Sequence, residues 1–375
     1  MTRLHGHILT PRGFVDGVVE FGADGRIAAL DGIPADTARV RDSGMPLVLP
    51  GFVDAHVHGG GGRDIMEGGD AAACVARLHA RHGTTSLLAT TMTAPAGDLE
   101  RAFTALGAQC GARQTGAARI LGVHLEGPYI NPDKLGAQPA FARPLAREEL
   151  QRLQAIAPIR LVTLAPEVAA NRMAIALLCA QGIKVQIGHS LASYEEGVDA
   201  LEHGATGFTH LFNAMTGLHH RTPGLVGAAL AHAQYAEIIP DLLHVHPGAI
   251  RVALRAIPRL FCVTDSTAAA GMPDGEYRLG LHTVNKCLGG VRLADGTLAG
   301  STLTMDQALR NLVNHLGLDL VDASRRVSTY AADFLGIADR GRLATGAWAD
   351  IVVLDRDLQV RDVITEGERV GDADA

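Results

Sequence analysis

The chain has 375 residues, of which 47% are hydrophobic and 19% are charged, and its formal net charge is −7. This length suits one large domain, or a large domain with a smaller one, and the composition excludes a disordered chain. Because the chain has no basic stretch that could follow a phosphate backbone and no apolar run long enough to cross a bilayer, we expect neither a nucleic-acid nor a membrane partner.

The two ends of the chain predict a small β domain. Residues 1–47 contain short strands broken by Gly and Asp turns, as in GVVEFGADGRIAAL, and residues 343–375 contain a further strand pair. No helical crossover separates these strands, so we expect the two segments to form a small β-sandwich domain together.

The N-terminus and the cysteines predict a cytoplasmic protein. The opening segment MTRLHGHILTPRGF lacks the apolar core of a secretory signal. The five cysteines have no paired spacing, so we expect them to be reduced.

Residues 48–342 predict a parallel barrel. Strand-like apolar stretches alternate with helical segments such as 70–83 and 193–204, and this alternation indicates a parallel sheet. The strand-like stretches are 47–58, 84–93, 118–127, 159–167, 183–190, 205–214, 236–245 and 259–266. Eight such units fit a (β/α)8 barrel of the TIM type, and a doubly wound open sheet is the structural alternative. Residues 274–300 predict a β-hairpin after the last barrel strand.

The stretch VDAHVHGGGG at 53–62 suggests a metal site. Side chains alternate between the two faces of a strand, so His56 and His58 point the same way. Two imidazoles on one face, followed by a loop of glycines, resemble two metal ligands with room for a substrate. A tight turn would also use these glycines.

Further polar residues follow the apolar cores of the other predicted strands. Barrel enzymes build their sites at the C-terminal ends of the strands. The residues at such positions are His56, His58, Glu126, His189, His210, His244 and Asp265. Taken singly, a histidine here could be a hydrogen-bonded core residue, Glu126 a turn residue, and Asp265 a helix N-cap. Taken together, burying them unpaired would be costly, and metal coordination satisfies them all.

The positions of the lysines argue against a metal centre that is bridged by a carbamylated lysine. Several barrel metallohydrolases bridge two metals with a carbamylated lysine, which must lie at the C-terminal end of a strand. Lys184 begins its predicted strand, Lys134 lies in a loop, and Lys286 lies in the predicted hairpin. We therefore expect a carboxylate in that role, and Glu126 is the candidate in the right place.

At these residues the chain resembles the N-acetylglucosamine-6-phosphate deacetylase family of the amidohydrolase superfamily. The motifs that carry the resemblance run in order from about residue 48 to residue 355. They are PGFVDAHVHGGGG, GVHLEGPYINPDKLGAQP, IGHS, THLFNAM followed by RTPG, DLLHVHP, VTDSTAAAGMPDGEY and LAGSTLTM.

The resemblance implies roles for particular residues. Metal ligands are implied at Glu126, His189 and His210, with His56 and His58 as ligands of a second metal, and Asp265 matches the catalytic aspartate. Substrate contacts are implied at Ala137, Gln138, Asn213, Ala214, Arg221, His244, Leu298, Ala299 and Gly300. Two positions depart from the family: many members have histidine where this chain has Gln138, and glycine where it has Leu242.

The implied reaction is hydrolysis of the acetamide of N-acetylglucosamine 6-phosphate to acetate and glucosamine 6-phosphate. A divalent cation, one ion or two, would activate the attacking water, with zinc expected and iron, cobalt or manganese as alternatives. Asp265 would act as general base and then as general acid, and Gln138 or His244 would polarise the carbonyl. Arg221 could bind the phosphate, or it could be a solvated surface residue. The resemblance also implies a homodimer.

Other functions stay open at this point. The chain could deacetylate the galactosamine epimer, or hydrolyse a hydantoin, dihydroorotate or an N-acyl amino acid. A barrel that has lost catalysis and serves as a binding scaffold is a remote alternative, since such a relative would be expected to have lost ligands. Hydrolysis with and without a chelator separates these classes.

Overall fold

A closed parallel barrel forms the larger part of the computed structural model, which describes residues 1–111 and 114–371. In these residues the barrel strands are β5 (Phe52–Val57), β8 (Thr84–Thr91), β9 (Arg119–Glu126), β10 (Ile159–Leu164), β11 (Lys184–Ile187), β12 (Gly207–Phe208), β13 (Tyr235–Ile238) and β14 (Arg259–Cys262). Strands β5 to β12 form one parallel sheet, and β13 pairs with β14. The amide of Leu211 donates to the Glu237 carbonyl (2.9 Å) and that of His58 to the Ser266 carbonyl (3.0 Å), which joins the two sheets on both sides. The predicted (β/α)8 barrel is confirmed.

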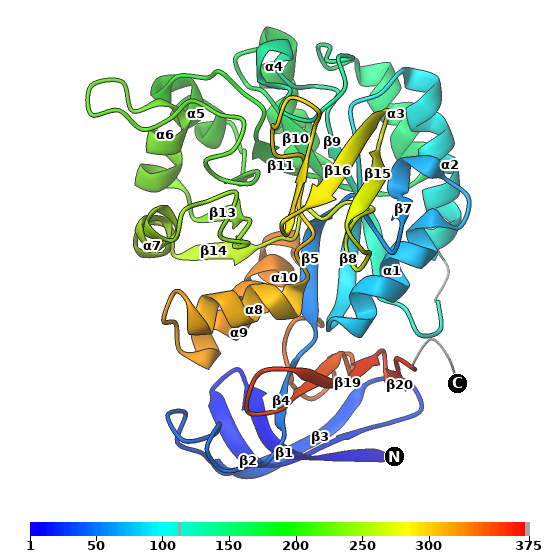
Figure 1. Cartoon of the computed structure of the whole chain (residues 1–375), viewed down its shortest axis with the longest axis vertical. Coiled ribbons are helices and arrows are strands. Elements are labelled where there is room, and N and C mark those ends of the chain that lie inside the picture. Colours follow the sequence, from blue (N-terminus) through cyan, green and yellow to red (C-terminus); the bar gives the residue numbers. More distant parts are fainter. Residues whose placement is uncertain (112–113, 372–375) are drawn as a thin grey trace.

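Helices surround this barrel (Figure 1). They are α1 (Ala71–Arg81), α2 (Ala96–Gly111), α3 (Arg147–Ile156), α4 (Ala169–Ala180), α5 (Tyr194–Glu202), α6 (Gly224–His232), α7 (Pro247–Ala256), α8 (Met305–Asn314), α9 (Leu320–Val327) and α10 (Thr329–Leu335). The short 3-10 turns are η1 (Ile65–Glu67) and η2 (Pro132–Lys134). Helix α5 begins where Ser193 and Glu196 form a capping box, which satisfies backbone donors of its first turn. No helix in the described ranges is long and apolar enough to cross a membrane.

The terminal segments pair in a second sheet, which lies beside the barrel (Figure 1). Its strands are β1 (Thr2–Thr10), β2 (Gly13–Phe21), β3 (Ile27–Pro34), β4 (Leu47–Pro50), β18 (Ile351–Leu354), β19 (Val360–Thr365) and β20 (Glu368–Arg369). N-terminal β4 pairs with C-terminal β18, so the predicted association of the two ends is confirmed. Apolar side chains such as Ile8, Phe21 and Ile351 form its core.

A buried ionic cluster joins this sheet to the barrel. The Arg340 guanidinium donates to Asp350 (2.6 Å) and contacts Glu366, which also accepts from Arg119 of β9 (2.8 Å). Because Arg340 is buried, these carboxylates neutralise a charge that would otherwise be costly at this position.

The excursion after β14 contains three strands where the sequence predicts two. These are β15 (Gly275–Leu279), β16 (His282–Cys287) and β17 (Gly290–Arg292), an antiparallel sheet. It lies across the barrel in Figure 1. Leu298 forms a bridge with Arg292 of β17, and Ser301 forms a bridge with Ser266, just after β14, so the end of the excursion returns to the barrel.

The glycines after His58 form a tight turn. Gly59 and Gly60 pair as β6 (Gly59–Gly60) with β7 (Arg63–Asp64). A Cβ on Gly59 would lie 2.4 Å from the Ala268 amide nitrogen, which leaves no room for any side chain. Close backbone packing is therefore the reason for glycine here. All five cysteines lie in the described residues and are free, as predicted.

Candidate metal centre and active site

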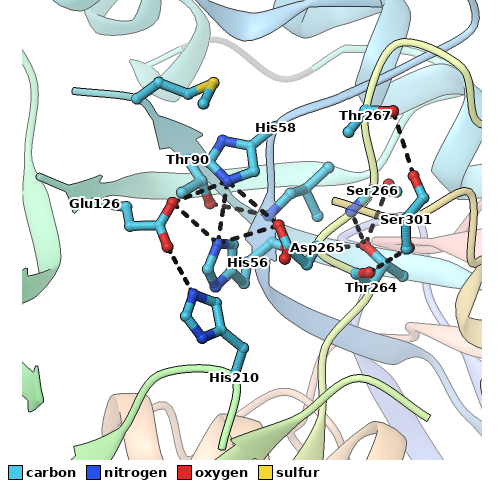
Figure 2. Close-up of polar contacts among 12 residues, drawn as sticks. His56, His58, Thr90, Glu126, His210, Thr264, Asp265, Ser266, Thr267 and Ser301 are labelled. Atoms are coloured by element: carbon cyan, nitrogen blue, oxygen red, sulfur yellow. Dashed lines mark hydrogen bonds and ion pairs between the residues drawn. The ribbon is translucent and has the colours of Figure 1, made fainter. Parts of the chain in front are cut away.

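Six buried side chains from the ends of five barrel strands converge at one end of the barrel. They are His56, His58, Glu126, His189, His210 and Asp265, and none is more than 8% exposed. Each lies at or just after the C-terminal end of a barrel strand, as the sequence predicts. Figure 2 shows the Glu126 carboxylate with His56 and His58 on one side and His210 on the other.

Glu126, His189 and His210 form the first donor set. Nε2 of His189 lies 3.0 Å and Nε2 of His210 lies 3.1 Å from Oε1 of Glu126, and the two nitrogens are 3.0 Å apart. Three ligands held tetrahedrally by one ion at about 2.0–2.1 Å are about 3.3 Å from each other. The spacing therefore fits a single divalent cation.

The second donor set contains His56, His58 and Asp265. The two Nε2 atoms lie 3.1 Å apart, and Oδ1 of Asp265 is 3.5 Å from His56 and 3.4 Å from His58. Oε2 of Glu126 approaches the same group, 3.0 Å from Nε2 of His58. One oxygen of Glu126 thus faces each set, which is the geometry of a bridging carboxylate.

Hydrogen bonds from the Nδ1 atoms of His189 and His56 determine which nitrogen of each ring faces the centre. Nδ1 of His189 can only donate to the carbonyl of Lys134 (2.8 Å), and Nδ1 of His56 donates to Oε2 of Glu237 (3.0 Å). In the neutral tautomer each Nε2 then presents a lone pair toward the Glu126 carboxylate. Lone pairs and a carboxylate that converge in a buried space favour a cation among them.

The pKa values of the cluster are shifted by the charges that its carboxylates and histidines exert on one another. Burial by itself lowers the pKa of His56, but the charges of Glu126 and Asp265 outweigh it and raise that pKa well above its ordinary value. Burial raises the pKa of Asp265, yet the charge of His56 and a hydrogen bond from His58 bring it down to about 2. The carboxylates therefore stay ionised at neutral pH and favour positive charge between them.

Glu237 is a site residue that the sequence analysis missed. It belongs to β13, is fully buried, and holds Nδ1 of His56 at 3.0 Å and the His210 amide at 3.3 Å. The sequence feature that could have identified Glu237 is its position as a charged residue in the short apolar stretch YAEII. Because its Oε2 contacts residues of both donor sets, Glu237 positions a residue of each set.

Replacing Glu237 with glutamine is expected to weaken binding of the ion at the second donor set about 10–100-fold. Glutamine keeps the shape but lacks the charge that orients the Nδ1–H of His56. The measurement is a metal titration of the metal-free variant followed by calorimetry, with Glu202→Gln on the exposed side of α5 as the control. Unchanged affinity in Glu237→Gln would contradict the positioning role.

Backbone strain is concentrated around the centre. Of the nine non-glycine residues with positive φ in the described chain, six lie after the ends of barrel strands: His189, His210, Phe212, Ala214, Leu242 and Asp265. Each such conformation costs on the order of 1 kcal/mol, and strain of this kind collects at functional sites. Leu242 has a φ of +66°, which explains why glycine suits this position in the family that the sequence resembles.

A cavity of about 390 Å³ opens above the donor sets. This volume is in the range of small-molecule sites. Of the predicted substrate contacts, those that line it are Ala137, Gln138, Asn213, Ala214, His244, Leu298 and Gly300. Within the described residues Ala299 and Arg221 are not in the lining: Ala299 is fully buried, and exposed Arg221 contacts Nε2 of His220 at 2.7 Å.

Gln138 and His244 differ in what they can offer a substrate. The Gln138 side chain donates to Oε2 of Glu126 (2.6 Å) and accepts from the Thr93 amide (2.7 Å), so both ends are engaged. Nδ1 of His244 donates a hydrogen bond to Asp241 (2.6 Å). Burial lowers the pKa of His244, but the hydrogen bond and the charge of Asp241 outweigh burial, so the pKa is raised. His244 thus has its Nδ1 anchored and its ring at the cavity wall.

Two of the alternative interpretations are wrong: Asp265 is not a helix N-cap, and Glu126 is not a turn residue. No helix begins at Asp265 in the described structure; a turn follows, and its amide donates to the His56 carbonyl (2.9 Å). Glu126 ends β9 and points inward to the histidines. Gly127, which follows it, has a φ of +72°, and a Cβ there would lie 2.0 Å from Oγ1 of Thr93.

Comparison with known proteins places this site in a family. The amidohydrolase family model matches residues 47–370. The N-acetylgalactosamine-6-phosphate deacetylase of Escherichia coli O157:H7 is 39% identical over 368 residues, covering 96% of this chain and 97% of the relative. The N-acetylglucosamine-6-phosphate deacetylase of Vibrio furnissii is 40% identical over 369 residues, covering 96% and 92%.

Solved structures agree with these relatives. The N-acetylglucosamine-6-phosphate deacetylase of Thermotoga maritima matches with a TM-score of 0.90 and 33% identity, over 99% of each chain. A mutant of the Mycobacterium smegmatis enzyme in complex with N-acetyl-D-glucosamine-6-phosphate matches with a TM-score of 0.90 and 37% identity, over 98% of this chain and 99% of the other. The chain therefore belongs to the amidohydrolase family, in the branch that contains the N-acetylglucosamine- and N-acetylgalactosamine-6-phosphate deacetylases.

Proposed function

We propose that this protein is a metal-dependent hydrolase that removes the acetyl group of N-acetylglucosamine 6-phosphate, with acetate and glucosamine 6-phosphate as products. The observation that carries the proposal is full-length similarity, at 33–40% identity, to relatives named for this reaction, one of them solved with this sugar phosphate. The six convergent donors support it, because an amide resists hydrolysis without such a centre.

The proposed metal ligands are the residues of the two donor sets. Glu126, His189 and His210 would hold one ion, and His56 and His58 would hold a second, with Glu126 between them. We propose zinc, because a nitrogen-rich set with one carboxylate at this spacing suits it. A bound divalent cation supplies Lewis acidity and lowers the pKa of a water toward neutrality.

Asp265 is proposed as the catalytic base and acid. Its carboxylate is ionised and lines the cavity, and the backbone amide of Asp265 is held on the His56 carbonyl of β5, so the carboxylate is placed to take a proton from the attacking water. When the C–N bond breaks, the same carboxyl group can return that proton to the departing amine nitrogen. His244, whose Nδ1 is anchored on Asp241, is the proposed donor to the carbonyl oxygen, since Gln138 is engaged with Glu126.

The test is acetate release from N-acetylglucosamine 6-phosphate and from the unphosphorylated sugar, with zinc-loaded protein. The proposal expects strong preference for the phosphorylated sugar. Equal activity on both, or activity on neither, would contradict it, and a panel of N-acyl amino acids would then test the other open class of linear amides.

N-acetylgalactosamine 6-phosphate is the second candidate substrate. The observation that favours it is the E. coli relative, 39% identical over almost its whole length. The two sugars differ in the orientation of one hydroxyl group, so kcat/KM measured side by side decides between them.

We further propose that the protein is a cytoplasmic homodimer. Sedimentation of the purified protein would test its oligomeric state.

A further inference from the structure

The loops that carry His58 and Asp265 are joined by a histidine of helix α1. This residue, His79, is fully buried. Its Nε2 lies 3.0 Å from the Gly59 carbonyl oxygen and 3.1 Å from Oγ of Ser266. Gly59 follows His58 in the chain, and Ser266 follows Asp265, so the ring contacts both loops at once. We propose that His79 is a positioning residue that fixes Asp265 relative to His58, an inference that rests on the proposed function.

The His79 ring is a neutral hydrogen-bond donor. A carbonyl oxygen can only accept, so Nε2 carries the ring hydrogen and donates it to Gly59. Burial lowers the pKa of His79 to about 4, so the ring has no charge at neutral pH. The Ser266 hydroxyl donates to the same carbonyl (3.2 Å) and lies against Nε2. The three groups therefore hold the two loops together without adding a charge beside the metal centre.

Backbone hydrogen bonds join the same two loops. The Ser266 carbonyl accepts from the amides of His58 (3.0 Å) and Gly59 (2.8 Å), and the Asp265 amide donates to the carbonyl of His56 (2.9 Å). These bonds run between the ends of β5 and β14. A side-chain bond from α1 adds a contact from the helix layer, so the junction is held from the barrel and from the helix that packs outside it.

Asp265 needs this support because its backbone is strained. Its φ is +48°, a left-handed conformation that is unfavourable for a residue with a side chain. Such a conformation persists only where surrounding contacts determine it. The residue after it, Ser266, is held through its carbonyl and through the hydroxyl that contacts His79. Loss of the second contact would let Asp265 relax away from His58, whose Nε2 lies 3.4 Å from Oδ1 of Asp265.

Packing alone does not explain a histidine at this position. His79 lies one turn after Val75 on the buried face of α1, with Ala76 and Ala80 beside it. An apolar side chain would fill this position equally well, whereas Nδ1 of the ring has no hydrogen-bond partner within the described residues. The unpaired nitrogen carries a free-energy cost, and the Nε2 contacts, which only a donor can make, offset it.

The test compares His79→Leu and His79→Gln with Val75→Ala, a loss of packing on the same face of α1. Leucine fills the space without a donor, whereas a glutamine amide can place an N–H where Nε2 lies. We expect His79→Leu to weaken cobalt(II) binding at the donor set of His56 and His58 about tenfold, and to change the visible absorption of the bound ion, which depends on ligand geometry.

Activity gives a second measurement on the same variants. In His79→Leu, kcat for acetate release should fall about tenfold with little change in KM, because the base is displaced while the substrate contacts remain. His79→Gln should recover most of the cobalt affinity and of kcat. Val75→Ala should match the wild type in both, although its melting temperature is lower.

The outcomes separate the residue from the reaction. If His79→Leu does not fold, Ser266→Ala tests the same junction with the loss of one hydroxyl, and it should lower the cobalt affinity about threefold. Unchanged affinity and spectrum in the folded variant, an equal change in Val75→Ala, or no recovery in His79→Gln overturns the role of His79. A wild-type protein that hydrolyses no acetylated sugar phosphate overturns the proposed function, whereas the cobalt measurements still test His79.

Discussion

Replacing Asp265 with asparagine is expected to lower kcat for acetate release about 10²–10⁴-fold, with a smaller change in KM. Asparagine keeps the shape of the side chain but cannot accept the proton of the attacking water. The Asp265 carboxylate is buried and ionised and lines the cavity, and the backbone amide of Asp265 donates a hydrogen bond to the His56 carbonyl of β5, which fixes the position of the residue.

The measurement is steady-state acetate release together with metal content. Oδ1 of Asp265 lies 3.4–3.5 Å from the two histidines of the second donor set, so loss of an ion must be distinguished from loss of the base. The variant should keep the ion held by Glu126, His189 and His210. Asp274→Asn, an exposed carboxylate in the excursion, is the control and should behave like the wild type. Activity of Asp265→Asn within threefold of the control would rule out the assigned role.

Removal of the metal is expected to abolish turnover. A chelator should lower acetate release about 10³-fold or more, since Lewis-acid stabilisation contributes several kcal/mol to the barrier. Glu126→Gln should reproduce this loss because Oε1 and Oε2 of Glu126 face different donor sets. Metal content by mass spectrometry and acetate release are measured on the same samples.

The metal that restores activity to the chelated protein identifies the ion. Zinc, iron, cobalt and manganese are added separately to the chelated wild type, and the ion that restores most activity at the lowest concentration is assigned. Glu126→Gln should not recover with any of them, whereas Glu148→Gln on the exposed side of α3 should recover fully. A chelated protein that stays active after its metal content has fallen to background would refute metal dependence.

The barrel and its inward donors follow from local sequence pattern. Each strand is short and apolar, as in RILGVHLE of β9, and the polar residue comes at or after its end. The period of two along a strand places His56 and His58 on one face without knowledge of the fold. The proposal that Glu126 takes the bridging role also comes from the sequence, because a lysine bridge needs a lysine at a strand end and this chain has none there.

Contacts between distant segments could not be derived in this way. Glu237 and His56 are 181 residues apart, and their contact exists only because the barrel closes through β13, β14 and β5. Gln138 lines the cavity, as expected, but its hydrogen bonds to Oε2 of Glu126 and from the Thr93 amide were not predicted. Pattern along the chain specifies which face a side chain occupies, and it does not specify the partner across the barrel.

The sequence by itself determined the fold class, the pairing of the two chain ends and the six polar residues that converge at one end of the barrel. It could do so because apolar periodicity, and the position of polar residues in it, are local properties. The tertiary structure alone decided that Glu237 supports His56 and that His79 contacts the loops that carry His58 and Asp265. These arrangements depend on loop conformations and on closure of the barrel, where hydrogen bonds and packing between residues far apart in the chain select one geometry among many.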